Sequence, residues 1–193
     1  MNKTIKLITG NQRKAESLQK LVEPFGFCVE IINVEAPEIQ ADSTAEVAAF
    51  AAKWVADKIK KPCVKMDSGF FIKEFGGFPG VYVRWVDEGL GAERFFDMLE
   101  KIENKKVMIT CSVAYCMPGE EPVTFFGSAL GCVPEKLGEK GSFIDRLFVP
   151  DDHNPDNITL GELRESYPDA VTEIWGRAEK KFIEWLIKQK GNK

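Results

Sequence analysis

The chain has 193 residues and a mass of 21.7 kDa, the size of one large domain or of two small lobes that share a core. Its 44% hydrophobic and 29% charged residues exclude a chain that is disordered throughout. The 26 Lys and Arg residues and the 30 Asp and Glu residues leave a net charge of −4 and form no dense basic stripe, so we expect no nucleic-acid partner.

Hydrophobic runs and cysteines set the expected compartment. No run approaches the roughly 20 apolar residues that a membrane span needs, so we expect no membrane partner. No apolar run follows Met1, so we also expect no signal peptide. The five cysteines are irregularly spaced without a C-x-x-C pair, which predicts reduced thiols in a cytoplasmic protein. The single histidine, His153, lies among polar residues, which disfavours a histidine base or a histidine zinc site.

The N-terminal residues predict a strand, a helix and a second strand. The β-branched run Thr4–Thr9 predicts a strand that Gly10 and Asn11 end. Apolar residues at helical spacing over 12–25 predict the helix, and the apolar run 27–34 predicts the second strand. A unit of this kind is typical of an α/β domain with parallel strand pairing.

Two capping boxes predict where later helices begin. Ser43 pairs with Glu46, and Thr159 pairs with Glu162. The other predicted elements are short strands over 63–66 and 70–72, a helix over 92–102, an antiparallel hairpin of 107–117 and 122–133, a strand over 143–149 and a final helix over 169–190. We therefore predict one mixed α/β domain over residues 1–193, with no linker and no internal repeat.

A polar turn between the first strand and the first helix is the first candidate site. Backbone N–H groups at a helix start favour an anion, and Thr9, Asn11 and Lys14 add donors and charge to Gly10. The P-loop pattern is absent. Spacing alone leaves open whether this turn binds phosphate or is a plain helix cap with solvated lysines.

Two acidic segments are candidates for a metal site. Asp67 follows an apolar strand and precedes Ser68 and Gly69, which is also the composition of a simple strand-ending turn. Glu38 lies in a loop that contains Pro37, where a glutamate is usually solvated. Paired in space, Glu38 and Asp67 would supply the oxygen ligands that Mg²⁺ prefers, but spacing does not show such a pairing.

Taken in order, these segments resemble the inosine triphosphate pyrophosphatase family over nearly the whole chain. The matching segments are Thr9-Gly10-Asn11, Glu38-Ile39-Gln40, Asp67-Ser68-Gly69-Phe70, Phe78-Pro79-Gly80-Val81-Tyr82, Phe126-Gly127, Gly141 with Asp145, Phe148-Val149-Pro150 and Arg177. The resemblance implies a two-lobed α/β fold with an elongated central mixed sheet flanked by helices, a deep cleft between the lobes, and a homodimer.

The resemblance also implies a reaction, namely Mg²⁺-dependent hydrolysis of nucleoside triphosphates, above all those of deaminated purines, to the monophosphate and pyrophosphate. It assigns the polyphosphate to Thr9, Gly10, Asn11, Lys14, Ser68 and Gly69, the metal to Glu38 and Asp67, the base to Asp145 and Arg177, and catalysis to Asp67, Lys14 and the more loosely aligned Lys53. A metal and a lysine suit this reaction because negative charge develops on the leaving pyrophosphate.

The chain departs from the family pattern at several positions. Met66 occupies the first of two positions that are acidic in the family, and Ser142 occupies the position of an aromatic ring that stacks on the base. Three positions that are polar base contacts in the family are occupied here by Val171, Trp175 and Gly176. We therefore expect an intact phosphate half and a remodelled base half, in which Phe143 replaces the missing ring or Trp175 stacks on the base, unless Trp175 is a core residue.

These departures leave other functions open. The first is a nucleotide-binding protein with reduced catalysis. The second is a pyrophosphatase with an altered base preference, acting on a modified pyrimidine or another phosphoanhydride.

Overall fold

The computed structural model describes residues 3–191, which form two compact units. Of the described residues, unit 1 comprises 3–67, 111–126 and 178–191, and unit 2 comprises 68–110 and 127–177. Unit 1 holds β1 (Lys3–Ile8), α1 (Gln12–Val22), the 3₁₀ helix η1 (Glu23–Phe25), β2 (Phe27–Ile32), α2 (Thr44–Ile59) and nearly all of α7 (Arg177–Gly191). The strands β3 (Cys63–Ile72), β5 (Lys106–Cys116) and β6 (Val123–Cys132) each run from one unit into the other.

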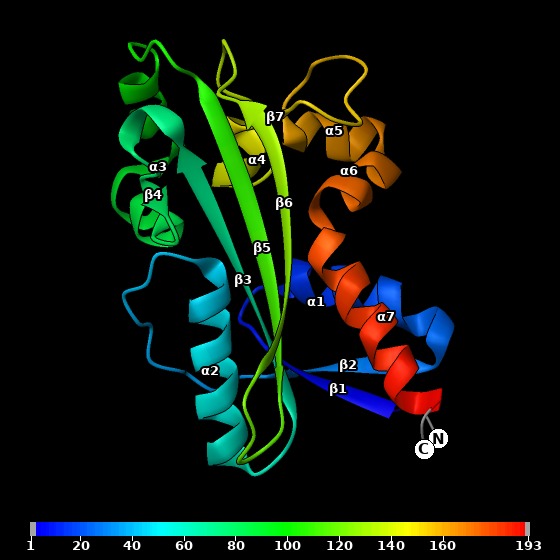
Figure 1. Cartoon of the computed structure of the whole chain (residues 1–193). Coiled ribbons are helices and arrows are strands. Elements are labelled where there is room, and N and C mark those ends of the chain that lie inside the picture. The colour runs from blue at the N-terminus through cyan, green and yellow to red at the C-terminus, as the bar shows by residue number, and fades with distance from the viewer. Residues whose placement is uncertain (1–2, 192–193) are drawn as a thin grey trace. The chain divides into compact units, whose positions relative to one another are not determined.

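Unit 2 holds the remaining short elements. They are η2 (Lys73–Phe75), β4 (Pro79–Gly80), α3 (Val83–Leu99), α4 (Phe143–Leu147), β7 (Val149–Pro150), α5 (Leu160–Ser166) and α6 (Pro168–Trp175). The strands form a seven-stranded sheet in the order β2-β1-β3-β5-β6-β7, and β4 pairs with β3 (Figure 1). β1 is parallel to β2 and β3, whereas β7 is antiparallel to β6, so the predicted mixed α/β class is confirmed.

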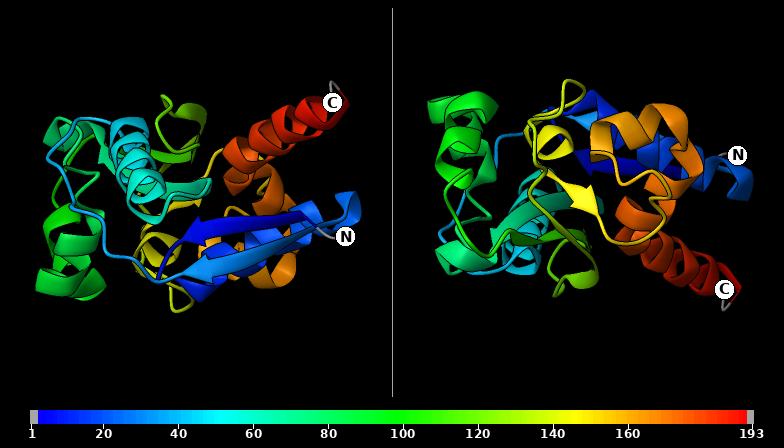
Figure 2. Two further views of the ribbon diagram at one scale, coloured as in Figure 1. Left: turned by 90° about the horizontal axis from the view of Figure 1, so that it is seen from below. Right: turned by 90° about the horizontal axis from the view of Figure 1, so that it is seen from above.

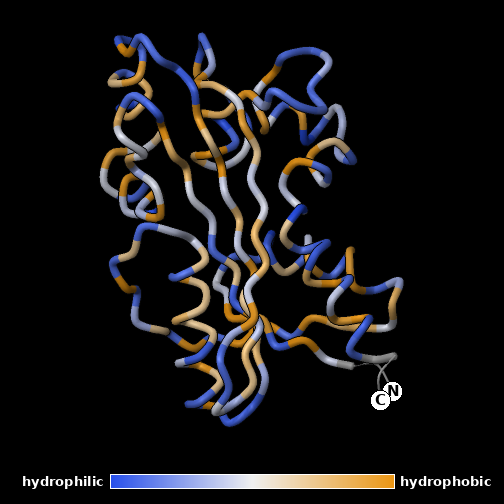
Figure 3. The backbone as a smooth tube through the Cα atoms, in the orientation of Figure 1, coloured by the Kyte–Doolittle hydropathy of each residue, from blue (hydrophilic) through white to orange (hydrophobic). Residues whose placement is uncertain are grey.

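The sheet of unit 1 has a separate hydrophobic core on each face. β1 and β2 run side by side from Lys3↔Phe27 to Ile8↔Ile32 (Figure 2). Because side chains alternate along a strand, Leu7 packs with α1 and α7, whereas Ile8 packs with α2. The loops of the chain are mostly hydrophilic and the strands mostly hydrophobic, as Figure 3 shows. Each face of this sheet is therefore held by helices that begin and end in polar loops.

Helix caps fix where the helices of unit 1 begin. The side chain of Asn11 accepts a hydrogen bond from the N–H of Arg13, and that of Ser43 accepts one from the N–H of Glu46, as the sequence predicted for Ser43. α2 ends at Lys60, which has a left-handed backbone with φ 54°. The caps therefore hold the first turns of α1 and α2 at defined positions beside the sheet.

Aromatic rings fill the core of unit 2. The ring centroids of Phe95 and Phe143 lie 5.3 Å apart, and those of Phe70 and Phe143 lie 6.3 Å apart in an edge-on contact. Phe143 is only 5% exposed. Such pairs stabilise a core beyond the area that they bury, so this cluster ties β3, α3 and α4 together.

The strand predicted over 143–149 is wrong, because these residues form α4 and then the short β7. Ser142 and Asp145 make a capping box in which the Asp145 carboxylate accepts hydrogen bonds from the N–H and O–H of Ser142. Two hydrogen-bonding residues at a helix start thus override the β-branched and aromatic composition of the segment.

Two other predicted boundaries are also wrong. Asp67, Ser68 and Gly69 do not end a strand but lie inside β3. The final helix is two helices, α6 and α7, that meet at Gly176. The predicted helix start at residue 92 agrees with the second half of α3, which follows the non-helical Gly91 at φ 73°, whereas the first half of α3, from Val83, was not predicted. Turn-forming residues and apolar periodicity do not by themselves fix these boundaries, since pairing with neighbouring strands extends β3.

All five cysteines are free thiols, and Cys63, Cys111 and Cys116 are buried, as predicted. Burial raises the pKa of the Cys63 thiol to about 12, which keeps it protonated. Among residues 3–191, no helix has the length and apolar character needed to cross a membrane.

The packing of β6 against β7 gives a test of the fold. A Cβ at Gly131 would lie 2.2 Å from the Val149 carbonyl oxygen and 2.5 Å from the Phe148 ring. We expect Gly131→Ala to lower the free energy of unfolding by about 1–3 kcal/mol in urea melts, because backbone must shift to admit the methyl group. Gly89→Ala is the matched control, since nothing lies within 4 Å of its Cβ position. Equal stability of the two variants would contradict this packing.

Candidate active site

The turn between β1 and α1 is built by its own side chains. The hydroxyl oxygen of Thr9 accepts a hydrogen bond from the N–H of Asn11 at 3.0 Å, and Oδ1 of Asn11 accepts one from the N–H of Arg13 at 3.0 Å. Both residues keep donor groups beyond these bonds, the O–H of Thr9 and the Nδ2–H₂ of Asn11. Nothing lies within 4 Å of a Cβ added to Gly10, so the turn has open space beside it. These donors beside open space at a helix N-terminus suit an anion.

Parallel pairing places this turn beside β3. The register of β1 and β3 aligns Leu7 with Val64 and Ile8 with Lys65. The residues that follow β1 therefore lie alongside Met66 and Asp67. β2 and β3 flank β1 on opposite sides, which makes the carboxyl end of β1 a topological switch point, where α/β sheets bind their ligands.

Lys14 connects the two segments directly. Its Nζ donates a hydrogen bond to the carbonyl oxygen of Met66 at 3.3 Å, across 52 residues of chain. The Met66 side chain is buried among α1 and α7, so alternation along β3 turns Asp67 toward the opposite face, the one that α2 covers in unit 1. The Lys14 ammonium thus reaches β3 at the residue before Asp67, whose side chain faces the other side of the sheet.

The candidate metal ligands are both carboxylates. Asp67 is partly buried, with its Oδ2 shielded from solvent, whereas Glu38 is exposed in the segment between β2 and α2. Residues 3–191 contain no cluster of three or more His, Cys, Asp or Glu side chains that could hold a metal. Proteins often hold Mg²⁺ through only one or two carboxylates, because this ion keeps several waters and takes its other oxygens from substrate phosphates.

The structure places Lys53 with a different partner from that of Lys14. The Lys53 ammonium pairs with Glu121, in the loop between β5 and β6, and this hydrogen bond raises the pKa of the lysine. Asp57, one turn further along α2, accepts a hydrogen bond from the N–H of Gly119 in the same loop. These contacts attach α2 to the β5–β6 loop.

Asp145 has hydrogen-bond partners within unit 2. It is 3% exposed, and besides Ser142 it binds the guanidinium of Arg164 at 2.9 Å. Burial alone would raise the pKa of Asp145, but Arg164 and the donors of Ser142 outweigh it and hold the pKa below its ordinary value. Its oxygens therefore accept hydrogen bonds inside unit 2.

The other expected base contacts also have partners in unit 2. The Arg177 guanidinium donates to the carbonyls of Ser128 and Glu173 and to the carboxylate of Asp152. Trp175 is partly buried against the core of this unit, and Phe143, the possible replacement ring, is inside it. Ser68 lies beside Asp67, and its Oγ is buried without a hydrogen-bond partner among the described residues.

Glu179 is the polar residue that the sequence did not reveal. It lies in the first turn of α7, is 1% exposed, and neither carboxylate oxygen has a hydrogen-bond partner among residues 3–191. Burial raises its pKa to about 7, and the charge of Lys14 opposes this rise in part. Its spacing gives a signal that could have found it, because Glu179 lies three residues before Phe182 and seven before Leu186, on the apolar face of the helix.

Comparison with known proteins finds similar sequences over nearly the whole chain. The dITP/XTP pyrophosphatase of Methanopyrus kandleri is 34% identical over 178 residues, covering 92% of this chain and 93% of that protein. The protein of the same name from Methanosarcina acetivorans is 33% identical and covers 94% of this chain and 96% of its own.

Solved structures share the fold. The Staphylococcus aureus Ham1 protein matches with a TM-score of 0.77 at 21% identity, covering 99% of this chain and all of its own. A HAM1 protein from Coxiella burnetii matches with a TM-score of 0.80 at 21% identity, covering 96% and 99%. A model of the Ham1 family matches residues 5–185, and the chain therefore belongs to the Ham1 family.

Proposed function

We propose that this protein hydrolyses nucleoside triphosphates to the monophosphate and pyrophosphate, with Mg²⁺ as cofactor and deaminated purine nucleotides such as dITP and XTP as substrates. The observation that carries the proposal is the contact of Lys14 with the Met66 carbonyl, which joins α1 to β3 one residue before Asp67, at the open turn after β1. The names of the archaeal relatives support the same substrate class.

In this proposal the polyphosphate binds to the turn between β1 and α1. The Thr9 hydroxyl and the Asn11 amide donate to phosphate oxygens, and the N–H groups at the start of α1 add a favourable dipole. Lys14 neutralises negative charge that grows on the leaving pyrophosphate. Ser68 and Gly69 lie next to Asp67 in the chain and complete the proposed phosphate contacts.

Glu38 and Asp67 are the proposed ligands of Mg²⁺. When bound, the metal supplies positive charge to the phosphates and orients a water for attack on phosphorus. The protein's own part is to hold two hard oxygen ligands in separate segments and to orient the polyphosphate through Lys14. Lys53 stays a predicted catalytic residue, although its contacts are with the β5–β6 loop.

Base recognition by Asp145, Trp175 and Arg177 stays a prediction. The hydrogen bonds of Asp145 and Arg177 within unit 2 favour a role in shaping the base site over direct reading of the base. A base site that makes few hydrogen bonds to the base discriminates weakly between different bases. We therefore propose that this protein accepts a broader range of bases than a site with many hydrogen-bond donors would.

A second candidate function is nucleotide binding without hydrolysis, which the apolar Met66 at an expected acidic position favours. Release of pyrophosphate from ITP, XTP, dITP, ATP, GTP and a pyrimidine triphosphate, with Mg²⁺ present, separates the two. Turnover of the deaminated purine nucleotides above ATP and GTP supports the enzyme. Tight binding with no pyrophosphate release from any nucleotide supports the second candidate.

Asp67→Asn tests the metal ligand. We expect at least a 100-fold loss of kcat/KM with little change in the unfolding midpoint, because a neutral amide binds Mg²⁺ poorly. Asp97→Asn, at an exposed position of α3, is the control and should retain full activity. Full activity of Asp67→Asn would contradict the assigned role.

Lys14→Ala tests the polyphosphate contact. Loss of one charge-assisted hydrogen bond predicts an increase of roughly 10- to 100-fold in KM for ITP, and a lower kcat to the extent that the contact strengthens in the transition state. Lys20→Ala changes an exposed lysine near the other end of α1 and should leave KM unchanged. The assignment fails if both variants keep the wild-type KM.

We also propose a homodimer that acts in a reducing compartment such as the cytoplasm. Five free thiols support the compartment, and the exposed rings of Phe78, Tyr82 and Trp85, 47%, 37% and 56% exposed, support an interface in unit 2. Light scattering should give twice the chain mass of 21.7 kDa. The mass of a single chain at micromolar concentration would contradict the dimer.

A further inference from the structure

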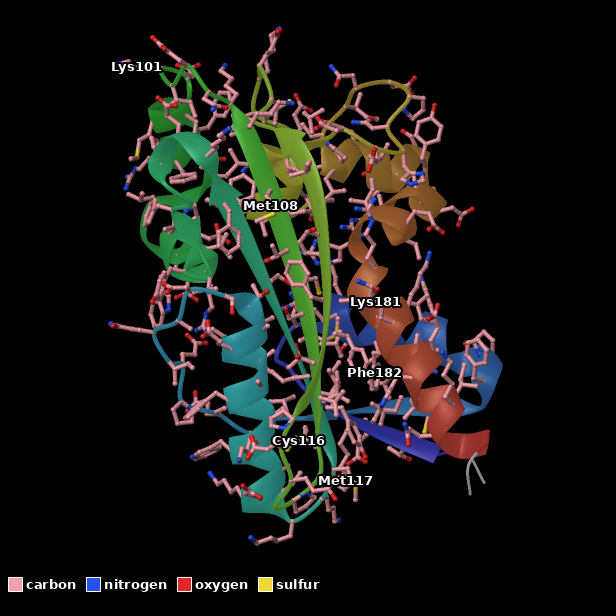
Figure 4. All side chains as sticks on the ribbon, in the orientation of Figure 1. Lys101, Met108, Cys116, Met117, Lys181 and Phe182 are labelled. Carbon is pink, nitrogen blue, oxygen red and sulfur yellow. The ribbon has the colours of Figure 1, made fainter. Side chains whose placement is uncertain are left out.

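The sheet of unit 2 carries helices on one face and a cavity on the other. On β3 and β5, Ile72 and Val107 belong to the core that α3, α4, α5 and α6 cover. Because side chains alternate along a strand, Phe71 and Met108 lie on the opposite face, and Figure 4 labels Met108 on the half of β5 that belongs to unit 2. There they line a cavity of about 410 Å³, which is within the size range of small-molecule sites.

Three adjacent strands supply the apolar wall of this cavity. Phe71 comes from β3, Met108 from β5 and Leu130 from β6, and these strands follow one another in the sheet. Leu130 is 61% exposed, whereas Phe71 and Met108 are partly buried. Within residues 3–191, no α-helix contributes to the lining. Covering this wall removes apolar surface from water, which favours the binding of an apolar group.

The loop after β3 holds the ring of Phe71. Gly77 and Gly80 have positive φ angles of 96° and 60°, and a Cβ at Gly80 would lie 3.3 Å from Cε1 of the Phe71 ring. A Cβ at Gly77 would lie 3.5 Å from Cδ1 of the same ring, so the ring packs against the backbone of both glycines. An aromatic ring beside the thioether of Met108 suits an aromatic ligand, since ring pairs and sulfur–ring contacts are both favourable.

The charged residues of the lining give the cavity one net positive charge. They are Lys73, Lys106 and Asp151. Nζ of Lys106 lies 3.6 Å from Oδ2 of Asp151, and these two charges offset each other. The exposed ammonium of Lys73 has no hydrogen bond or ion pair within the part of the chain that the structure describes. It is therefore free to donate a charge-assisted hydrogen bond to an anionic group.

A second hollow beside the cavity limits the charge of the ligand. It also involves Lys106. Its other lining residues are Glu74, Glu103, Asn104, Lys105 and Cys132. Its two glutamates and two lysines leave it without net charge, so it offers no attraction to a second anionic group. A ligand with several negative charges, such as a polyphosphate, therefore suits this part of unit 2 poorly.

We propose that this cavity binds a small aromatic monoanion, a carboxylate of one or two rings that packs against Phe71, Met108 and Leu130 and pairs with Lys73. The apolar wall accounts for the ring, and the unpaired ammonium accounts for the single charge. All lining residues belong to unit 2, whereas the turn proposed for the polyphosphate belongs to unit 1. The inference therefore does not depend on the proposed hydrolysis.

Methyl NMR tests where the ligand binds. In protein labelled with ¹³C at methionine methyl groups, Met108→Leu identifies the Met108 signal, and 2-naphthoate is the probe. At millimolar 2-naphthoate the ring current of the bound probe should shift the Met108 signal more than any other methionine signal. Met98, 49% exposed on α3, is the internal control and should keep its position. A Met108 signal that does not respond would overturn the proposal.

Calorimetry tests the charge of the ligand. 2-Naphthamide and 2-naphthylmethylammonium carry the same rings with a neutral and a positive group. We expect 2-naphthoate to bind roughly fivefold more tightly than the amide, the effect of one partly exposed ion pair, and the ammonium compound to bind most weakly. Lys73→Gln should remove the difference between carboxylate and amide, whereas Lys101→Gln, an exposed lysine of unit 2, should retain it. Equal affinities of the three compounds for wild-type protein would contradict an anionic ligand.

The apolar wall has its own test. Leu130→Asn should weaken the binding of 2-naphthoate roughly tenfold, because apolar area is lost from the wall. Leu90→Asn, at a 40% exposed position of α3, should leave the affinity unchanged. The same affinity in both variants would place the ligand elsewhere.

Dilution without ligand distinguishes a small-molecule site from an interface between copies of this chain. The proposal predicts a Met108 signal that stays constant over a dilution series followed by light scattering. A signal that shifts together with a fall in mass would assign the cavity to such an interface and overturn the proposal.

Discussion

The parallel pairing of β1 with β3 is the constraint on which the candidate site depends. Its register brings the turn after β1 alongside Met66 and Asp67, and the hydrogen bond from Lys14 to the Met66 carbonyl closes the arrangement. A shift of one residue in this register would turn the Met66 side chain out of the core and Asp67 into it, so burial of Met66 also fixes the position of the carboxylate. Stability and candidate chemistry therefore rest on the same strand pair.

Polar groups are used differently in the two units. In unit 2, Asp145 and Arg177 make several hydrogen bonds to neighbouring backbone and side chains, which is how buried charges are kept at low cost. In unit 1, Thr9 and Asn11 use their oxygens to build a turn and retain their donors. Hydrogen-bond donors that are not used in bonds within the protein are the groups that can bind a ligand.

Local sequence patterns predicted what local interactions determine. The strand-helix-strand start, the helix start at Ser43 and the capping box of Thr159 with Glu162 are confirmed, because each depends on residues a few positions apart. The segment 143–149 and the length of β3 could not be predicted from composition, since capping and strand pairing override propensity there. The spacing of Glu179 with Phe182 and Leu186 places it on the apolar face of α7, but the residue type favours solvent, so its burial follows from the packing of this face against the sheet.

The most direct measurement is a crystal structure of the protein with Mn²⁺, as an anomalous substitute for Mg²⁺, and a non-hydrolysable analogue of ITP. The account predicts an anomalous peak bonded to carboxylate oxygens of Asp67 and Glu38, with phosphate oxygens in hydrogen-bond contact with Lys14 and the turn at Thr9–Asn11. A metal bound elsewhere, or an analogue whose phosphates lie away from that turn, would contradict it.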